Sequence, residues 1–208
     1  VADIVPLRGE NRIIVKKGLK FLAETKRIGL KKLMELSGLN LNQIKTYDIG
    51  FKIAPKLNAV GRLESAYAAL NLLLSEDEHE GTEIAKYLNS QNLKRQEIEN
   101  QIYREAEAII TSNEEFLNLP IIVLAKEDWH PGVIGIVSSR LTSKYYKPTL
   151  MISLDSEGVG RGSARSIEQV NIMELFGKVQ NMFLEYGGHP MAAGFSINSS
   201  QVDDLRKA

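Results

Sequence analysis

The stretch from Glu80 to Ile110 constrains the fold of this chain more than any other feature. After Gly81 it contains neither glycine nor proline, its apolar positions are widely spaced, and residues 89–97 are polar nearly all round. A helix that is polar on every side usually bridges two domains rather than packing inside one. We therefore expect a connecting helix over residues 80–112, with a domain junction on it.

The residues before this stretch indicate an all-helical part. Residues 11–37 carry apolar side chains at spacings of three and four, which predicts helix. A short helix is expected after Thr46 or Asp48, since either side chain can cap it. Pro55–Leu63 is interpreted as a loop that leads into another helix, Ala66–Leu74.

The residues after 118 have an α/β pattern instead. Short apolar or alternating runs predict strands, and longer runs with helical spacing predict helices. The expected strands are 120–125, 148–154, 159–166 and 194–197, the expected helices are 133–145 and 172–184, and a glycine-rich corner precedes the last strand. This order predicts an α/β domain whose mixed, partly parallel sheet is covered by helices.

Composition excludes several classes of protein. The 208 residues include no cysteine, which excludes disulfides, thiolate metal sites and a cysteine nucleophile. No run approaches the ~18 apolar residues of a membrane span, and a cytoplasmic location is expected. The sequence begins at Val1 and its first methionine is Met34, so we expect a piece of a longer protein.

The net charge of zero conceals an uneven distribution. Residues 1–62 hold 13 basic against 5 acidic residues, whereas residues 63–112 hold 4 against 10 and residues 113–208 hold 9 against 11. A basic first third fits a phosphate-bearing partner, and it equally fits a solvated lysine-rich surface. Aromatic residues are few and scattered, which does not indicate a surface for stacking bases.

Two local patterns could carry chemistry near helix or strand starts. Asp3 follows a small residue and precedes an apolar stretch, so it is either a ligand for a hard divalent cation or a turn residue. His130 precedes a predicted helix that starts Pro-Gly, where unpaired N–H groups are expected. Gly132 and Gly135 leave room for a ligand there, and the alternative is a capping histidine beside glycines needed for packing.

Two further patterns suggest anion binding. On the predicted strand 159–166, Arg161, Ser163 and Arg165 alternate onto one face, and two guanidinium groups around a hydroxyl suit a phosphate. The alternative is an arginine pair that faces solvent. The sequence Gly187-Gly188-His189 places an imidazole beside accessible backbone N–H groups, which also outlines an anion site.

These motifs together resemble a known family. Gly187–Phe195 (GGHPMAAGF) is similar to the signature of the DHHA1 domain, which accompanies DHH-type phosphoesterases. Asn58–Leu63 (NAVGRL), His130–Arg140 (HPGVIGIVSSR) and Gly162–Ser166 (GSARS) narrow the resemblance to the RecJ exonucleases of that family. The resemblance covers essentially the whole chain, with the motifs in the expected order.

The resemblance implies a metal-dependent 5′→3′ exonuclease that hydrolyses phosphodiester bonds of single-stranded DNA in repair and recombination. Two Mn²⁺ or Mg²⁺ ions would activate water, and Asp3 would help hold one of them. His189 would face the scissile phosphate and His130 would lie nearby, both as catalytic residues. The residues that the resemblance assigns to phosphate or nucleic acid are Arg62, Arg161, Ser163, Arg165, Ser166, Gly187 and Gly188. Single-stranded DNA is the implied partner, and a single-strand-binding protein and a helicase are further candidate partners.

The chain also departs from the family pattern. Such enzymes carry an Asp-x-Asp motif, a further Asp and an Asp-His-His motif before the position that Val1 matches, and this sequence holds none of them. The resemblance therefore implies the C-terminal part of a DHH domain over residues 1–79, a connecting helix over 80–112 and a DHHA1 domain over 113–208. We expect these 208 residues to be catalytically inactive by themselves.

Two other functions stay open at this point. One is a DHH/DHHA1 phosphodiesterase that acts on short oligoribonucleotides or cyclic dinucleotides, and the other is a module that only binds nucleic acid. The Asn58–Leu63 and His130–Arg140 motifs favour the exonuclease over the phosphodiesterase.

Overall fold

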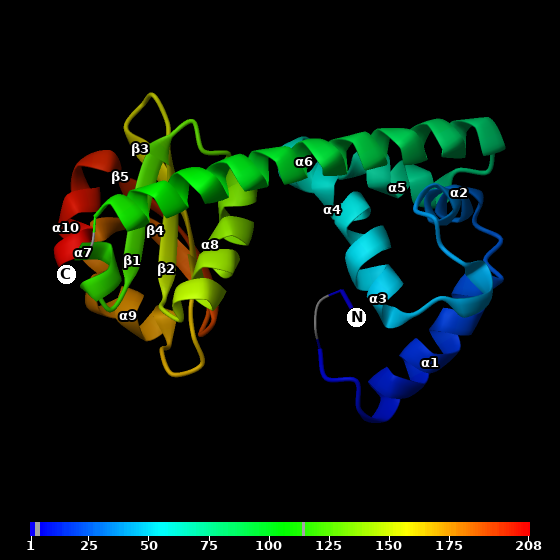
Figure 1. Ribbon diagram of the computed structural model, residues 1–208, viewed down its shortest axis with the longest axis horizontal. Helices are drawn as coiled ribbons and strands as arrows, with labels where there is room; N and C mark the ends of the chain where they lie inside the picture. Colours follow the sequence, from blue (N-terminus) through cyan, green and yellow to red (C-terminus); the bar gives the residue numbers. More distant parts are fainter. Residues whose placement is uncertain (3–4, 114) are drawn as a thin grey trace. The chain divides into compact units, whose positions relative to one another are not determined.

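The structure is a computed structural model that describes residues 1–2, 5–113 and 115–208 (Figure 1). The chain forms two compact units, Val1–Gln96 and Glu97–Ala208, and the boundary between them falls within one long helix, α6 (Glu78–Ser112). The predicted long helix is thus present and begins two residues earlier than expected. No described helix is apolar over a length sufficient to cross a bilayer.

The first unit is helical, as predicted, around a small apolar core. Its helices before α6 are α1 (Gly9–Ala23), α2 (Ile28–Leu36), η1 (Leu41–Gln43), α3 (Thr46–Asp48), the π-helical η2 (Ile49–Ile53), α4 (Ala54–Leu63) and α5 (Tyr67–Leu74). The core contains Leu33, Met34, Val60, Leu72 and Leu88, all fully buried.

Two expectations for this unit are wrong in detail. The helical run predicted over residues 11–37 is interrupted between α1 and α2. Pro55–Leu63 is not a loop, because it forms most of α4, where Pro55 occupies the first turn. Proline is tolerated at that position because the N–H it lacks would have no partner within the helix. A helix is present at the expected place, but neither expected residue is its N-cap: α3 begins at Thr46 itself, Lys45 is the N-cap residue, and Asp48 is the last residue of α3.

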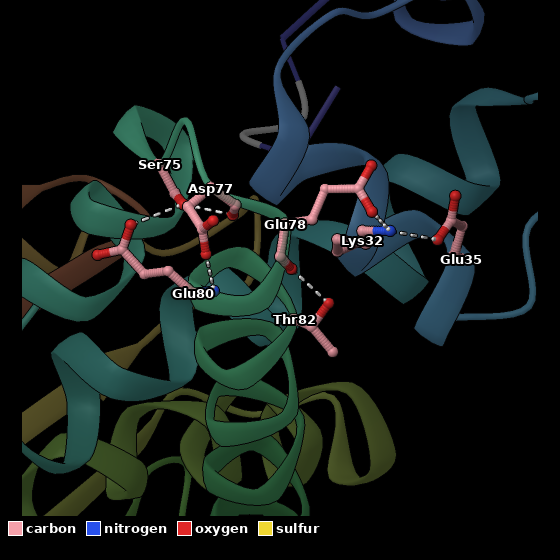
Figure 2. Close-up of polar contacts among 7 residues, drawn as sticks. All are labelled: Lys32, Glu35, Ser75, Asp77, Glu78, Glu80 and Thr82. Carbon is pink, nitrogen blue, oxygen red and sulfur yellow. Dashed lines mark hydrogen bonds and ion pairs between the residues drawn. The ribbon is translucent and has the colours of Figure 1, made fainter.

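The start of α6 explains why so long a helix begins where it does (Figure 2). The Asp77 carboxylate accepts from the backbone N–H of Glu80 at 2.7 Å, which satisfies one of the unpaired donors of the first turn. The Ser75 hydroxyl, which is buried, lies 2.9 Å from the Glu80 carboxylate. Lys32 of α2 forms an ion pair with Glu78 at 3.0 Å, and this contact links α2 to the start of α6.

The second unit is built on one five-stranded sheet (Figure 1). Its elements after α6 are α7 (Glu115–Asn118), β1 (Ile122–Glu127), α8 (Pro131–Tyr145), β2 (Thr149–Leu154), β3 (Val159–Arg165), α9 (Ile172–Lys178), η3 (Gln180–Met182), β4 (Phe183–His189), β5 (Ala192–Asn198), η4 (Ser199–Gln201) and α10 (Val202–Lys207). The strand order is β1-β2-β3-β5-β4, with β1 and β2 parallel and the other pairs antiparallel. The predicted mixed, partly parallel sheet is confirmed.

The two faces of this sheet are covered differently. On one face α9 and α10 close a core that includes Ile152, Ala164, Phe176 and Phe195. On the other face α8 packs over β2 and β3. The rest of that second face, over β5 and β4, carries exposed or half-buried positions. A ligand site on this face is therefore restricted to the open part over β5 and β4 and to the adjoining β3 side chains that α8 leaves exposed or half-buried.

The C-terminal expectations need one correction. The helix predicted over 172–184 ends at Lys178, and a strand, β4, begins at Phe183. The expected glycine-rich corner is the second half of that strand, and the turn to β5 is only Pro190-Met191. Phe183 and Phe176 lie with ring centroids 4.6 Å apart, so tertiary packing outweighed the helical spacing of this segment.

The second half of α6 is fixed to β1 and α8 by ion pairs and hydrogen bonds. The Glu105 carboxylate accepts from Lys126 at 2.8 Å, from the Trp129 indole at 2.9 Å and from Gln101 at 3.0 Å. These three donors lower the pKa of Glu105 from 4.5 to about 2, the Lys126 contact most of all. Arg140 of α8 pairs with Glu99 at 2.9 Å in the same way.

We expect the stability of the second unit to depend on the charge of Glu105. Because the folded-state pKa is depressed, this carboxylate stabilises the fold above about pH 4.5, and the contribution is lost as pH falls towards 2. We expect the free energy of unfolding to fall by about 2 kcal/mol as Glu105 becomes protonated. This value is smaller than the full pKa shift would give, because 29% of the Glu105 side chain is exposed and solvent screens its charge. Urea unfolding of the wild type and Glu105→Gln between pH 2 and 6 measures it. If the unfolding free energies of the wild type and Glu105→Gln change with pH in parallel, the prediction is wrong. The control is Glu97→Gln, because Glu97 is an exposed residue of the same helix.

Candidate phosphate-binding site

The side chains predicted to bind phosphate on β3 share one face of the sheet. Gly160, Gly162 and Ala164 face the core under α9, since a Cβ on Gly162 would meet the Phe195 ring and Ala164 belongs to that core. Arg161, Ser163 and Arg165 alternate with them and therefore lie on the α8 face. Arg161 is exposed, and the other two are half-buried.

Arg165 is held in place by its neighbours on β3 and by α8. Its Nη1 donates to the Ser163 hydroxyl at 3.0 Å and to the Ala164 carbonyl at 2.7 Å. The guanidinium also passes close to Gly135 of α8, where an added Cβ would lie 3.1 Å from Nη2 and 2.8 Å from the Ser163 hydroxyl. Gly135 therefore provides the space in which this arginine and serine lie side by side.

The register of the antiparallel strands places the Gly-Gly-His motif on the same surface. Ser163 pairs with Gly194 of β5, which pairs with Gly187 of β4, and Arg165 pairs in the next row through Ala192 with His189. Directly paired residues project to the same face. The Cα atom of His189 therefore lies about 10 Å from that of Arg165, which is the distance of two strand spacings. The β5 residues on this face between them, Ala192 and Gly194, are small.

The absence of a side chain has a different structural consequence at Gly188 than at Gly187. A Cβ on Gly188 would lie 2.3 Å from the Ala192 carbonyl oxygen, so no side chain fits there. A Cβ on Gly187 would meet nothing within 4 Å, so its absence leaves the backbone accessible rather than relieving a clash. His189 is exposed, and its Nδ1 accepts from the Met191 N–H at 3.4 Å, which leaves Nε2 as the donor towards solvent.

An open depression of about 720 Å³ lies on this face, over β3, β5 and β4. Arg161, Glu185, Gly187, Gly194 and Ser196 line it. Glu185 and Ser196 form a paired row with Arg161, and the sequence analysis did not single them out. The signal that could have found Glu185 is two-residue alternation in β4, which was concealed because that segment was assigned to a helix. Ser196 could have been found by its alternation with Phe195 and Ile197 in the strand that was predicted.

His130 caps α8. Its Nδ1 accepts from the backbone N–H of Gly132 at 3.1 Å, so the capping alternative describes the observed contact. The helix start is further fixed by the Ser153 hydroxyl, which donates to the Trp129 carbonyl at 2.5 Å. His130 therefore has a structural contact, and its side chain is half-buried.

The remaining predicted residues lie elsewhere. Ser166 is buried, and its hydroxyl donates to the Val170 carbonyl at 2.6 Å, so it shapes the turn after β3. Arg62 is exposed near the end of α4 in the first unit. Asp3 lies outside the described residues. The structure thus brings together Arg161, Ser163, Arg165, the two glycines and His189.

Comparison with known proteins finds similar sequences over nearly the whole chain. Residues 118–208 match the family model of the DHHA1 domain. The single-stranded-DNA-specific exonuclease RecJ of Bacillus subtilis is 42% identical over 99% of this chain and 26% of its own length. The protein of the same name from Haemophilus influenzae is 39% identical over 99% of this chain and 37% of its own length.

Solved structures give the same result for the fold. The crystal structure of RecJ from Thermus thermophilus in complex with Mn²⁺ matches with a TM-score of 0.88 and 32% identity, over 100% of this chain and 30% of that one. Its counterpart with Mg²⁺ matches with a TM-score of 0.86. The chain therefore spans roughly a quarter to two fifths of the length of the curated relatives named above.

Proposed function

We propose that this chain, whose residues 118–208 match the family model of the DHHA1 domain, is the phosphate-binding part of a 5′→3′ exonuclease specific for single-stranded DNA. The observation that carries the proposal is the line of Arg161, Ser163 and Arg165 on the sheet face that α8 covers in part, with Gly187 and His189 across from it on the open part of that face. The names of the similar proteins support the same substrate.

The chemistry of this face suits a terminal phosphate. Arginine presents a planar fork of donors that matches phosphate oxygens, and Arg165 is already oriented by its contacts to Ser163 and Ala164. The backbone at Gly187 is open to close approach, since no side chain covers it. His189 would donate from Nε2 to a phosphate oxygen that gains charge in the transition state.

The relatives whose structures are named with Mg²⁺ or Mn²⁺ support a divalent cation as cofactor of the whole enzyme. In the part of the chain that the structure describes, no group of three histidine, aspartate or glutamate side chains that could hold such an ion is present. The described residues therefore do not fit the metal, and no step is assigned to it here. Their contribution is to bind and orient the strand.

Binding of end-labelled oligonucleotides tests the proposal. We expect the chain to bind a 5′-phosphorylated single strand at least about tenfold more tightly than the same strand with a 5′-hydroxyl, because a charge-assisted hydrogen bond contributes about 1.5–3 kcal/mol. Fluorescence anisotropy at several salt concentrations measures the affinities. A matched blunt duplex is the control for strand specificity. Equal affinity for the two single strands would show that this face does not recognise a terminal phosphate.

A further inference from the structure

Gly135 lies in the interior of α8, where glycine is unfavourable for the helix itself. Alanine is the better helix former, because glycine loses more backbone freedom when it is fixed in a helix. Gly135 is buried in the packing of α8 on the sheet. The helix alone therefore gives no reason for glycine at this position, and the surface against which it packs does.

Two buried hydroxyl side chains fix α8 on β2 and β3. The Ser138 hydroxyl donates to the Thr149 carbonyl of β2 at 2.7 Å, and the Thr142 hydroxyl donates to the Arg165 carbonyl of β3 at 3.4 Å. Gly135, Ser138 and Thr142 are three and four residues apart, so they lie on the same face of the helix. The face that carries Gly135 is therefore held against the strands, and α8 cannot move away from β3 without breaking these hydrogen bonds.

The atoms opposite Gly135 belong to two side chains of the candidate phosphate-binding site. A Cβ at this position would lie 2.8 Å from the Ser163 hydroxyl oxygen and 3.1 Å from Arg165 Nη2. The next atom, the Ser163 Cβ, would be at 3.5 Å, which is an ordinary contact distance. Both close atoms can move, since a hydroxyl group rotates about one bond and a guanidinium ends a flexible side chain. A side chain at position 135 would therefore displace the binding groups rather than the backbone.

The Ser163 hydroxyl and the Arg165 guanidinium depend on one another for their positions. Arg165 Nη1 donates to that hydroxyl at 3.0 Å, so rotation of the hydroxyl away from position 135 would remove one of the contacts that orient the guanidinium. A charge-assisted hydrogen bond to phosphate requires a short distance and good alignment. Crowding at position 135 is therefore expected to weaken phosphate binding at Arg165.

We infer that Gly135 is a positioning residue of the phosphate-binding site. The absence of a side chain at this position allows the Ser163 hydroxyl and the Arg165 guanidinium to adopt the arrangement that prefers a terminal phosphate. The inference rests on the proposed function, since it names a residue that determines the specificity of the same site. Gly135 acts through Arg165 and does not itself have to touch the strand.

The test compares Gly135→Ala with Gly162→Ala, because the two substitutions crowd β3 from opposite faces of the sheet. Fluorescence anisotropy gives the affinities of each variant for a 5′-phosphorylated and a 5′-hydroxyl strand of the same sequence, and urea unfolding gives its stability. The ratio of the two affinities does not depend on the folded fraction, because the same folded molecules bind both strands.

We expect Gly135→Ala to remain folded and to lose most of the preference for the phosphorylated strand. Its two affinities should lie within about threefold of one another, because a charge-assisted hydrogen bond weakens steeply when its alignment is lost. In Gly162→Ala the added Cβ would meet the Phe195 ring on the other face. This control should lose stability and keep the preference of at least about tenfold that is expected of the wild type.

A double substitution shows whether Gly135 acts through the arginine. In an Arg165→Ala background, Gly135→Ala should change the affinity for the phosphorylated strand by less than about twofold, because no guanidinium is left to position. Equal losses in the two backgrounds would overturn the inference. A Gly135→Ala variant that keeps the full preference, or that does not fold, would also overturn it, and the proposed function then stands if Arg165→Ala loses the preference. If the wild type binds the two strands equally, both proposals fail.

Discussion

Replacement of Arg165 by alanine is expected to weaken binding of a 5′-phosphorylated single strand by about 10- to 150-fold. The guanidinium is oriented by the Ser163 hydroxyl and the Ala164 carbonyl, so little side-chain entropy is lost when it meets a phosphate. A charge-assisted hydrogen bond contributes about 1.5–3 kcal/mol, which corresponds to that range of affinity. Anisotropy titrations with the phosphorylated strand measure the loss.

Two further variants make the Arg165 result specific. Arg165→Lys keeps the charge and loses the planar fork, so it should recover only part of the affinity. Lys178→Ala removes one positive charge from α9, which covers the opposite face of the sheet, and should bind nearly as well as the wild type. If Arg165→Ala and Lys178→Ala lose affinity equally, the effect is general electrostatics and Arg165 does not contact the phosphate.

Replacement of Gly162 by alanine is expected to destabilise the second unit by about 2–3 kcal/mol. A Cβ at this position would lie 2.1–2.4 Å from three carbons of the Phe195 ring, closer than real contacts allow. Phe195 cannot move freely, because its ring packs against Phe176 and Phe183 at centroid distances of 5.3 and 5.2 Å. Overpacking of a well-packed core typically costs about 1–3 kcal/mol.

The neighbouring strand provides the matched control for Gly162. Gly194 of β5 is also a strand glycine, but a Cβ there would meet nothing within 4 Å. Gly194→Ala should therefore leave the unfolding free energy within about 0.5 kcal/mol of the wild type or raise it slightly. Urea unfolding followed by circular dichroism compares the two variants. Equal unfolding free energies for Gly162→Ala and Gly194→Ala would contradict the expected clash with the Phe195 ring.

Local chemistry determined the elements that the sequence predicted correctly. The long helix α6 follows from a stretch without glycine or proline after Gly81, since nothing within it interrupts the i→i−4 hydrogen bonds. The alternation of Arg161, Ser163 and Arg165 follows from the two-residue period of a strand, which requires no tertiary contact. The motifs that resemble RecJ exonucleases could likewise be identified from the sequence, because each is short and contiguous.

Tertiary packing decided what the sequence could not predict. The segment around Phe183 has helical spacing, but β4 forms there because pairing with β5 and packing of Phe183 against Phe176 and Phe195 outweigh local propensity. Pro55–Leu63 contains the turn-favouring residues of a loop, yet it forms helix α4, whose Val60 is fully buried in the core of the first unit.

The candidate sites show the same division. The sequence placed Arg165 on one face of a strand, but only the packing of α8, with Gly135 opposite, determined that this face is partly covered and partly open. The two-residue spacing of Gly187 and His189 is visible in the sequence, whereas their position across from Arg165 depends on the pairing of β4 with β5 and of β5 with β3. Periodicity is a property of the backbone and can be read locally. Which strands lie side by side is decided by residues distant in the chain, and that is why only the tertiary structure brought Arg165 and His189 to one surface.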